Sequence, residues 1–350
     1  MLAAEIRVAP PLDPRSSLAK SPVDWKQIVT PLEPFLQAVS KRMGEQISAF
    51  ETDLASYAAY ALSAHGKQLR PALVGLSASA TGKIQDAHIT VAVIIEMVHL
   101  ATLVHDDVMD EATMRRGRPT MAANWGNEIS VLLGDCLFAK SLKLAASFPT
   151  TEVCRAVSSS TDTVCEGEIL QTLRRRDLRS TRTEYLRMLA MKTGELFALA
   201  CDMGGYLSGA VPREREALRG FGLALGTAYQ IYDDCLDLFG SEGVAGKSLG
   251  TDLRKGKLTL PILAILEKGE RTVAGELETL VADYQPQCFN RVVALLQQNG
   301  ALEDSFKVIQ QYLAEAREHA AILRESESRA GLLALCGVLA TQTESLGVAA

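Results

Sequence analysis

The chain has 350 residues and a formal net charge of −6, and its side chains are 47% hydrophobic but only 5% aromatic. A chain of this length can bury a large core without cross-links, and its acidic balance argues against a nucleic-acid partner, since phosphate backbones are bound by basic surfaces. Its seven cysteines are scattered and include no Cys-x-x-Cys pair, so we expect free thiols in a reducing cytoplasm.

The first 22 residues contain several prolines and mixed charges but no apolar segment of the signal-peptide type. We therefore expect a disordered leader over residues 1–22, followed by one helical domain over residues 23–350. Near the end of the chain, the uncharged residues 330–343 fall short of the roughly 18 residues that a membrane span needs. No transmembrane segment is expected, and the predicted location is the cytoplasm.

Apolar residues recur at helical spacing along most of the chain, and strand-like alternation is scarce. Thr30, Pro31 and Glu33 are typical of a helix start, with Thr30 as the N-cap. Further helices are expected over residues 47–63, from 69, and over 89–110, 129–148, 151–173, 184–207 and 214–239, with several more after 260. Residues 117–119 and 240–256 are predicted loops. Because no linker divides the chain, we expect an all-α fold made of a single large helical bundle.

Two of the expected apolar helices lead into the same acidic motif, Asp-Asp-x-x-Asp, once from Asp106 to Asp110 and once from Asp233 to Asp237. Chance would give on the order of 0.1 such triplets in a chain of ordinary composition. Carboxylates one helical turn apart repel each other, and at a helix C-terminus they also oppose the macrodipole. Mg²⁺ offsets this repulsion, since it is bound by one or two carboxylates together with phosphate oxygens and water. The alternative is that each motif is only a solvated acidic helix end. That alternative could explain one such cluster but explains two of them poorly.

Basic residues accompany both motifs and also begin an upstream helix. They are Arg115, Arg116 and Arg118 after the first motif, Lys247, Arg254, Lys255 and Lys257 after the second, and Lys67 and Arg70 upstream. Helix N-termini favour anions, and Arg binds phosphate through two parallel hydrogen bonds. Acidic residues that hold metal, beside basic residues that hold phosphate, indicate a diphosphate site. Lys255 is interpreted as a solvated loop charge.

Together these motifs resemble the trans-isoprenyl (polyprenyl) diphosphate synthase family, from about residue 41 to the last helices. The matching segments are residues 66–71, 99–110, 114–117, 134–135, 167–171, 192–193, 229–237 and 256–261. The resemblance implies a helical bundle around a central cavity, across which the two acidic motifs face each other. It also implies a homodimeric, Mg²⁺-dependent prenyltransferase that joins isopentenyl diphosphate head to tail to an allylic diphosphate.

The resemblance also implies a role for each matching residue. Asp106, Asp110 and Asp233 would ligate Mg²⁺, with Asp107, Asp234 and Asp237 supporting them or reaching metal through water. Arg115, Lys192 and Lys257 would hold the allylic diphosphate, with Lys247 as a further contact. Lys67, Arg70, His99 and Arg116 would hold isopentenyl diphosphate. Thr193 and Gln230 would place oxygen dipoles near the allylic carbocation.

Several of these positions have simpler interpretations or depart from the family pattern. His99 could be a core histidine, Thr193 ordinary packing, and Gln171 only a brace of the cavity wall. Gln68 occupies a position that is usually basic in the family. The tail after Glu344 lacks the arginine that often ends its members.

Product length is predicted from the turn that precedes the first motif. One isoprene unit is comparable to one helical turn of about 5.4 Å, so the product tail is expected to pass Ala101 and Thr102 first. Neither is aromatic, whereas short-chain members of the family often carry a bulky ring there, so the sequence is more like the octaprenyl-type synthases. Phe138 is predicted to form a deeper floor below Met97 and Val98. The expected product is about C40, with geranylgeranyl or farnesyl diphosphate as the alternative.

Other functions fit parts of the sequence. A class I terpene cyclase shares the first motif, but the resemblance would then lead us to expect an Asn/Ser/Glu metal motif in second place. A non-catalytic subunit of a heteromeric synthase would lose metal ligands, and a purely structural helical protein would not need the basic residues. The expected partners are therefore the two diphosphate substrates and a second copy of the chain, with a loose membrane contact for product release.

Overall fold

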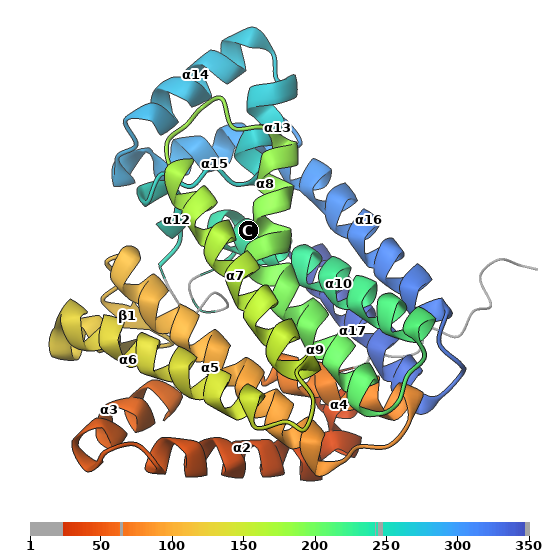
Figure 1. Cartoon of the computed structure of the whole chain (residues 1–350). Helices are drawn as coiled ribbons and strands as arrows, with labels where there is room; N and C mark the ends of the chain where they lie inside the picture. Colours follow the sequence, from red (N-terminus) through yellow and green to blue (C-terminus); the bar gives the residue numbers. More distant parts are fainter. Residues whose placement is uncertain (1–23, 64–65, 242, 244–247, 347–350) are drawn as a thin grey trace, which may run out of the picture.

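The computed structural model describes residues 24–63, 66–241, 243 and 248–346, which form a bundle of helices (Figure 1). The predicted leader and Lys247 lie outside these residues. Within them, the strands are confined to an antiparallel hairpin of β1 (Met114–Arg115) and β2 (Arg118–Pro119). The prediction of an all-α fold is confirmed.

The helices, in chain order, are α1 (Trp25–Val29), α2 (Glu33–Ser48), α3 (Thr52–Ser63), α4 (Leu69–Thr81), α5 (Asp86–Met109), α6 (Met121–Ala146), α7 (Glu152–Leu173), α8 (Arg182–Leu189), α9 (Glu195–Leu207), α10 (Pro212–Phe239), α12 (Thr251–Arg254), α13 (Leu260–Lys268), α14 (Arg271–Ala282), α15 (Phe289–Gln298), α16 (Ala301–Ala321) and α17 (Glu327–Glu344). Short 3-10 turns occupy Thr30–Leu32 and Pro286–Cys288, and a π-helical turn occupies Ala190–Gly194.

The core lies around α5, which packs against α2, α4, α6 and α9. Among the described helices only α5 is long and apolar enough to span a membrane, and 56% of its most apolar stretch is buried inside the bundle. Residues 91–95 of this helix are fully buried. The packing of the core therefore accounts for the hydrophobicity of α5, whose C-terminal end carries the first acidic motif.

Several helix boundaries differ from the prediction. Thr30 lies in a 3-10 turn and is not an N-cap, and Ile47 belongs to the end of α2. Helix α6 begins at Met121 because the chain continues through a kink at Gly126, whose φ of 86° glycine adopts most readily. The predicted helix over residues 184–207 is interrupted by the π-helical turn that contains Lys192 and Thr193. Such turns are frequent at functional sites.

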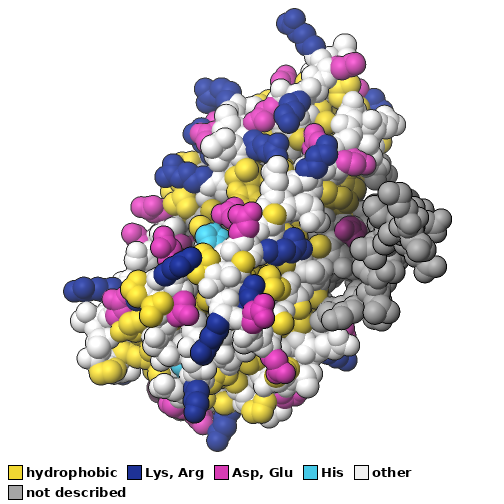
Figure 2. Space-filling model, turned by 90° about the vertical axis from the view of Figure 1, so that its right-hand side faces the viewer, with side chains coloured by type: hydrophobic (Ala, Val, Ile, Leu, Met, Phe, Trp, Pro, Cys, Tyr) yellow, Lys and Arg dark blue, Asp and Glu magenta, His cyan; other side chains and the backbone are white. Residues whose placement is uncertain are grey.

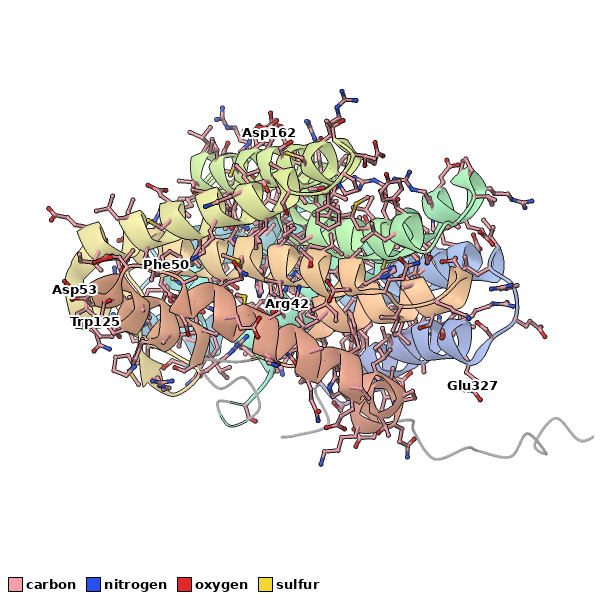
Figure 3. The ribbon with its side chains drawn as sticks, turned by 60° about the horizontal axis from the view of Figure 1, so that its bottom comes forward. Arg42, Phe50, Asp53, Trp125, Asp162 and Glu327 are labelled. Atoms are coloured by element: carbon pink, nitrogen blue, oxygen red, sulfur yellow. The ribbon has the colours of Figure 1, made fainter. Side chains whose placement is uncertain are left out.

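Helices α2 and α3 run across the bottom of the bundle, as Figures 1 and 3 show. Trp125, labelled in Figure 3, packs edge-on against Tyr57 and Tyr60 of α3, with ring centroids 5.2 and 4.8 Å away. The Tyr60 hydroxyl donates a 2.8 Å hydrogen bond to the backbone oxygen of Pro119 in β2. Helix α3 thereby anchors the hairpin that follows the first motif.

Acidic and basic side chains are interspersed on the face drawn in Figure 2, and neither charge gathers there into one large patch. That face therefore offers no basic footprint for nucleic acid.

Candidate active site

A cavity of about 1290 Å³ opens where α5 and α10 end. Most of the residues predicted for the site line it: Lys67, Arg70, His99, Asp106, Asp107, Asp110, Arg115, Arg116, Lys192, Thr193, Gln230, Asp233 and Lys257. Residues from both ends of the chain meet here because α4, α5, α9 and α10 pack together in the core. The two acidic motifs and the predicted phosphate-binding residues therefore share one site.

In the first motif, Asp107 is directed at a side chain of the hairpin. It is 5% exposed, and its Oδ1 accepts a 2.8 Å hydrogen bond from Nε of Arg115 and lies 2.8 Å from Nη2 in an ion pair. Burial raises the pKa of Asp107, and the charge of Arg115 opposes this rise. Asp107 thus orients Arg115 at the cavity wall.

Asp110 is surrounded by cations. Its Oδ2 lies 3.0 Å from Nζ of Lys255 and 3.1 Å from Nζ of Lys257, and its Oδ1 accepts a 2.8 Å hydrogen bond from Arg175. Burial alone would raise the pKa of Asp110, but Lys257 and Lys255 outweigh burial and lower it to about 2. Asp110 is therefore ionised at neutral pH, as a metal ligand must be. The interpretation of Lys255 as a solvated loop charge is wrong.

Lys192 joins α7 to the first motif. Its Nζ lies 2.6 Å from Oε1 of Glu168 and 3.7 Å from Oδ2 of Asp106, and it donates a 3.1 Å hydrogen bond to Gln171. Burial favours a lower pKa for Lys192, but Asp106 and Glu168 raise it above the ordinary value, so the ammonium is charged. Glu168 was not among the predicted site residues, although it lies in the matching segment 167–171.

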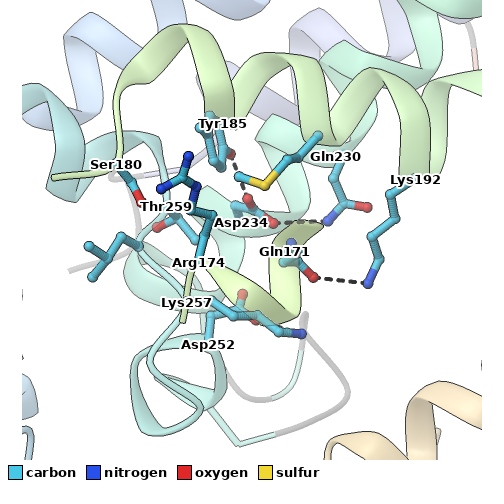
Figure 4. A pocket seen from close by; sticks show the side chains of 12 residues that line it. Gln171, Arg174, Ser180, Tyr185, Lys192, Gln230, Asp234, Asp252, Lys257 and Thr259 are labelled. Carbon is cyan, nitrogen blue, oxygen red and sulfur yellow. Dashed lines mark hydrogen bonds and ion pairs between the residues drawn. The ribbon is translucent and has the colours of Figure 1, made fainter. Parts of the chain in front are cut away.

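The second motif places its three carboxylates in three environments. Asp233 lines the main cavity. Asp234 faces a small adjoining pocket of about 50 Å³, where it accepts hydrogen bonds from Tyr185 at 2.5 Å and from Gln230 at 2.9 Å (Figure 4). Burial, followed by the charge of Asp252, raises the pKa of Asp234 to about 7. Thr193 in turn donates a 2.8 Å hydrogen bond to Oε1 of Gln230, so one hydrogen-bonded chain links Asp234 to the main cavity.

Asp237 is fully buried and holds the segment that follows α10. Its Oδ1 accepts from the hydroxyl of Thr251 at 2.7 Å and from that residue's backbone nitrogen at 3.3 Å. Its Oδ2 accepts from the backbone nitrogen of Asp252 at 3.1 Å. Of the two roles predicted for Asp237, support fits this geometry. Metal contact through water stays a prediction.

The cavity wall formed by α4, α5 and the hairpin carries the second group of cations. Nε of Arg70 is buried without a hydrogen-bond partner, and burial lowers the pKa of this arginine. Burial and the nearby arginines hold the pKa of His99 well below its usual range, so the imidazole is neutral. Glu96, absent from our sequence predictions, lines the same wall and offsets part of the charge of Arg70 and Arg116. A buried guanidinium with an unused donor fits an anionic ligand.

Gln68, the departure from the family pattern, lines the cavity. Its Nε2 donates a 2.8 Å hydrogen bond to the hydroxyl of Ser40 in α2. At the far end of the chain, Gln342 of α17 reaches the cavity lining.

The residues predicted to control product length are not all placed as expected. Thr102 lines the cavity, but Ala101 is fully buried and does not. The ring of Phe138 lies 5.7 Å from that of His105, immediately before the first motif. The His105 ring also lies against Gly134, so Phe138 is one turn further along α6, and its role as a deeper floor stays a prediction.

The acidic residues fit Mg²⁺ shared with a phosphate ligand. In the part of the chain that the structure describes, no three Asp, Glu, His or Cys side chains form a ready metal cage. Mg²⁺ does not need one, since it takes one or two carboxylates and completes its shell with phosphate oxygens and water. Asp106, Asp110 and Asp233 line one cavity, and Asp252, which the sequence analysis missed, lines it with them.

Comparisons with known proteins point the same way as this geometry. Residues 51–298 match the model of a family described as polyprenyl synthetase. The chain is 39% identical over 222 residues to octaprenyl diphosphate synthase of Escherichia coli (strain K12), covering 63% of this chain and 69% of that protein. It is 35% identical over 315 residues to all-trans-nonaprenyl-diphosphate synthase (geranyl-diphosphate specific) of Rhodobacter capsulatus, covering 89% and 97%.

Among solved structures, polyprenyl synthase from Caulobacter crescentus CB15, complexed with calcium and isoprenyl diphosphate, has the same fold. It superposes with a TM-score of 0.87 at 30% identity, over 92% of this chain and 99% of that one.

Proposed function

The chain belongs to the polyprenyl synthetase family of prenyltransferases, and on that premise we propose that it is a Mg²⁺-dependent trans-polyprenyl diphosphate synthase. It joins isopentenyl diphosphate head to tail to an allylic diphosphate in the cytoplasm. The observation that carries this proposal is one cavity that aspartates of both acidic motifs line together with two groups of cations. We propose a product of about C40, because the turn before the first motif carries no aromatic side chain. Geranylgeranyl diphosphate is the second candidate.

The allylic diphosphate is held by Arg115, Lys192 and Lys257. Mg²⁺ bound by Asp106, Asp110 and Asp233 would supply charge that stabilises the leaving diphosphate. Asp107 orients Arg115 and Glu168 orients Lys192, so these cations are in position before the reaction begins. Preorganised charge of this kind usually makes the largest single contribution to catalysis.

Isopentenyl diphosphate binds at the wall that carries Lys67, Arg70, His99 and Arg116. The allylic C–O bond breaks, its electrons leave with the diphosphate, and a carbocation remains. The oxygens of Thr193 and Gln230 face this cation with their lone pairs. The double bond of isopentenyl diphosphate then attacks the allylic carbon, and the adduct loses a proton to the released diphosphate.

We also propose that two copies of the chain associate through α6 and α7. Among the described residues, large exposed apolar side chains concentrate on these two neighbouring helices: Val131, Leu132, Leu142, Ile169 and Leu173. Leu132 and Leu173 are 60% and 73% exposed. A second copy with twofold symmetry would cover both helices in each protomer.

Purified protein incubated with Mg²⁺, isopentenyl diphosphate and farnesyl diphosphate tests the proposal. We expect polyprenyl diphosphates that extend to about C40 by chromatography, and no product when a chelator removes the metal. If the folded protein makes no prenyl diphosphate that is longer than the allylic starter, whichever starter is used, the proposed reaction is excluded. A main product of C20 would favour the second candidate.

A further inference from the structure

Arg175 follows α7 and reaches the rim of the cavity, where it binds Asp110. Its Nη2 donates a 2.8 Å hydrogen bond to Oδ1 of Asp110, and its Nη1 lies 3.5 Å from the backbone oxygen of Met109. Its Nε is buried and has no hydrogen-bond partner. The side chain lines the cavity and is 26% exposed. No role assigned above involves this arginine.

The unpartnered Nε matters because Nε and Nη2 together form one edge of the guanidinium. That edge can donate two parallel hydrogen bonds to a carboxylate or phosphate. Arg115 uses both atoms of this edge on Asp107. Arg175 uses only Nη2, so half of its edge is unoccupied.

The partner that Arg175 does have is one of the proposed ligands of Mg²⁺. Once Asp110 binds a divalent cation, the negative charge of Asp110 no longer neutralises Arg175, Lys255 and Lys257. A partly buried cation without a counter-charge is costly. The diphosphate that arrives with the metal is the anion that can replace Asp110 as the partner of these three side chains.

We propose that Arg175 is a further ligand of the allylic diphosphate, held on Asp110 in the metal-free protein and transferred to the diphosphate when metal and substrate bind. This inference rests on the proposed function. It gives Arg175 two effects of opposite sign. The arginine competes with Mg²⁺ for Asp110, and it strengthens the binding of diphosphate.

Titration calorimetry can measure both effects without turnover. The wild type, Arg175→Gln and a control are titrated with Mg²⁺ alone, and then with inorganic pyrophosphate at saturating Mg²⁺. Arg175→Gln is expected to lower the Kd for Mg²⁺ about threefold and to raise the Kd for pyrophosphate about tenfold, the range of single ion pairs and charge-assisted hydrogen bonds. The control is Arg179→Gln, because Arg179 is 89% exposed and pairs with Asp177. It should change neither constant.

Arg175→Lys keeps the positive charge but removes the two-atom edge, so it also decides the matter if the Gln variant does not fold. This variant should leave the Kd for Mg²⁺ unchanged and raise the Kd for pyrophosphate. If Arg175 has only a structural role, its replacement should weaken the binding of both Mg²⁺ and pyrophosphate. That result, or an unchanged Kd for pyrophosphate, overturns the inference. A folded wild type that binds no pyrophosphate in the presence of Mg²⁺ instead contradicts the proposed function itself.

Discussion

The hydroxyl of Tyr185 donates a 2.5 Å hydrogen bond to Oδ2 of Asp234, and the amide of Gln230 donates one of 2.9 Å to Oδ1 of the same carboxylate (Figure 4). Because an amide has one donor end and one acceptor end, the bond to Asp234 fixes which way Gln230 points. Its oxygen then accepts from Thr193. The second aspartate of the second motif therefore positions a group at the cavity while lying outside the cavity lining.

Replacing Tyr185 with Phe tests this arrangement. Loss of the hydroxyl frees one oxygen of Asp234 and loosens Gln230, so we expect kcat to fall about tenfold, the scale of one hydrogen bond to a charged group, with an unchanged KM for isopentenyl diphosphate. Steady-state kinetics measure both constants. Tyr206→Phe is the matched control, since Tyr206 contacts Thr150 at the protein surface. Equal kcat in the two variants would show that the Tyr185 hydroxyl does not help to position Gln230.

Replacing Asp106 or Asp233 with Ala should remove most turnover, on the order of a hundredfold or more, and leave the fold intact, because relieving like-charge repulsion does not destabilise a helix end. Turnover at saturating Mg²⁺ and thermal unfolding measure the two effects. Near-normal activity in both variants would exclude the proposed metal site.

Asp237→Asn should behave differently from these two changes. Asp237 accepts hydrogen bonds from Thr251 and from the backbone of Asp252, so its loss should lower Tm by weakening the segment that carries Lys257. A variant with wild-type Tm would show that this carboxylate does not hold the segment.

The turn before the first motif should control product length. Thr102→Phe places a ring at the cavity wall, and Ala101→Phe places one in the adjoining core, so both should shift the main product towards C15 or C20. Ala101 is fully buried, so its variant should also lose about 1–3 kcal/mol of stability through overpacking. Chain-length analysis and urea denaturation measure the two effects. An unchanged product distribution in two active variants would contradict the gate.

His88, near the N-terminus of α5, should make stability depend on pH. Its Nδ1 accepts from the backbone nitrogen of Gln85 at 2.9 Å and its Nε2 lies 3.1 Å from the backbone oxygen of Gly204, so the neutral ring donates to Gly204. Burial lowers the pKa of His88 below its ordinary value of 6.5. In the unfolded chain His88 is therefore protonated at a higher pH than in the folded chain. The free energy of unfolding consequently falls as pH drops below about 6.5.

Urea denaturation of the wild type and of His88→Leu at about pH 8 and pH 5.5 isolates this effect, since other groups titrate in both proteins. The wild type should lose more stability between the two pH values than the variant does. Equal losses would show that His88 does not contribute.

Leu132→Asp should disrupt the proposed dimer, because it places a charge on the exposed apolar surface of α6. Light scattering at micromolar concentration should show a dimer for the wild type and a monomer for the variant. Ile322→Asp changes a side chain that is 41% exposed but lies away from α6 and α7, and it should stay dimeric. A monomeric wild type would refute the assembly.

Much of this protein could be predicted from its sequence, because the relevant signals are local. Apolar residues at helical spacing identified most helices, and the two Asp-Asp-x-x-Asp motifs with their basic neighbours indicated a diphosphate site. Carboxylates one turn apart repel wherever the helix lies in the fold, so the need for counter-charge was visible without coordinates.

Only the tertiary structure decided which role each aspartate has. Asp107 turns to Arg115, Asp234 to Tyr185 and Asp237 to Thr251. Tyr185 and Asp234 are 49 residues apart in the chain, and no local pattern joins them. The same holds for Arg175 at Asp110, and for the ring of Phe138 beside His105. A helical repeat determines which side chains share a face of one helix, but the group that each of them meets depends on how separate helices pack, and that contact decides what a carboxylate does.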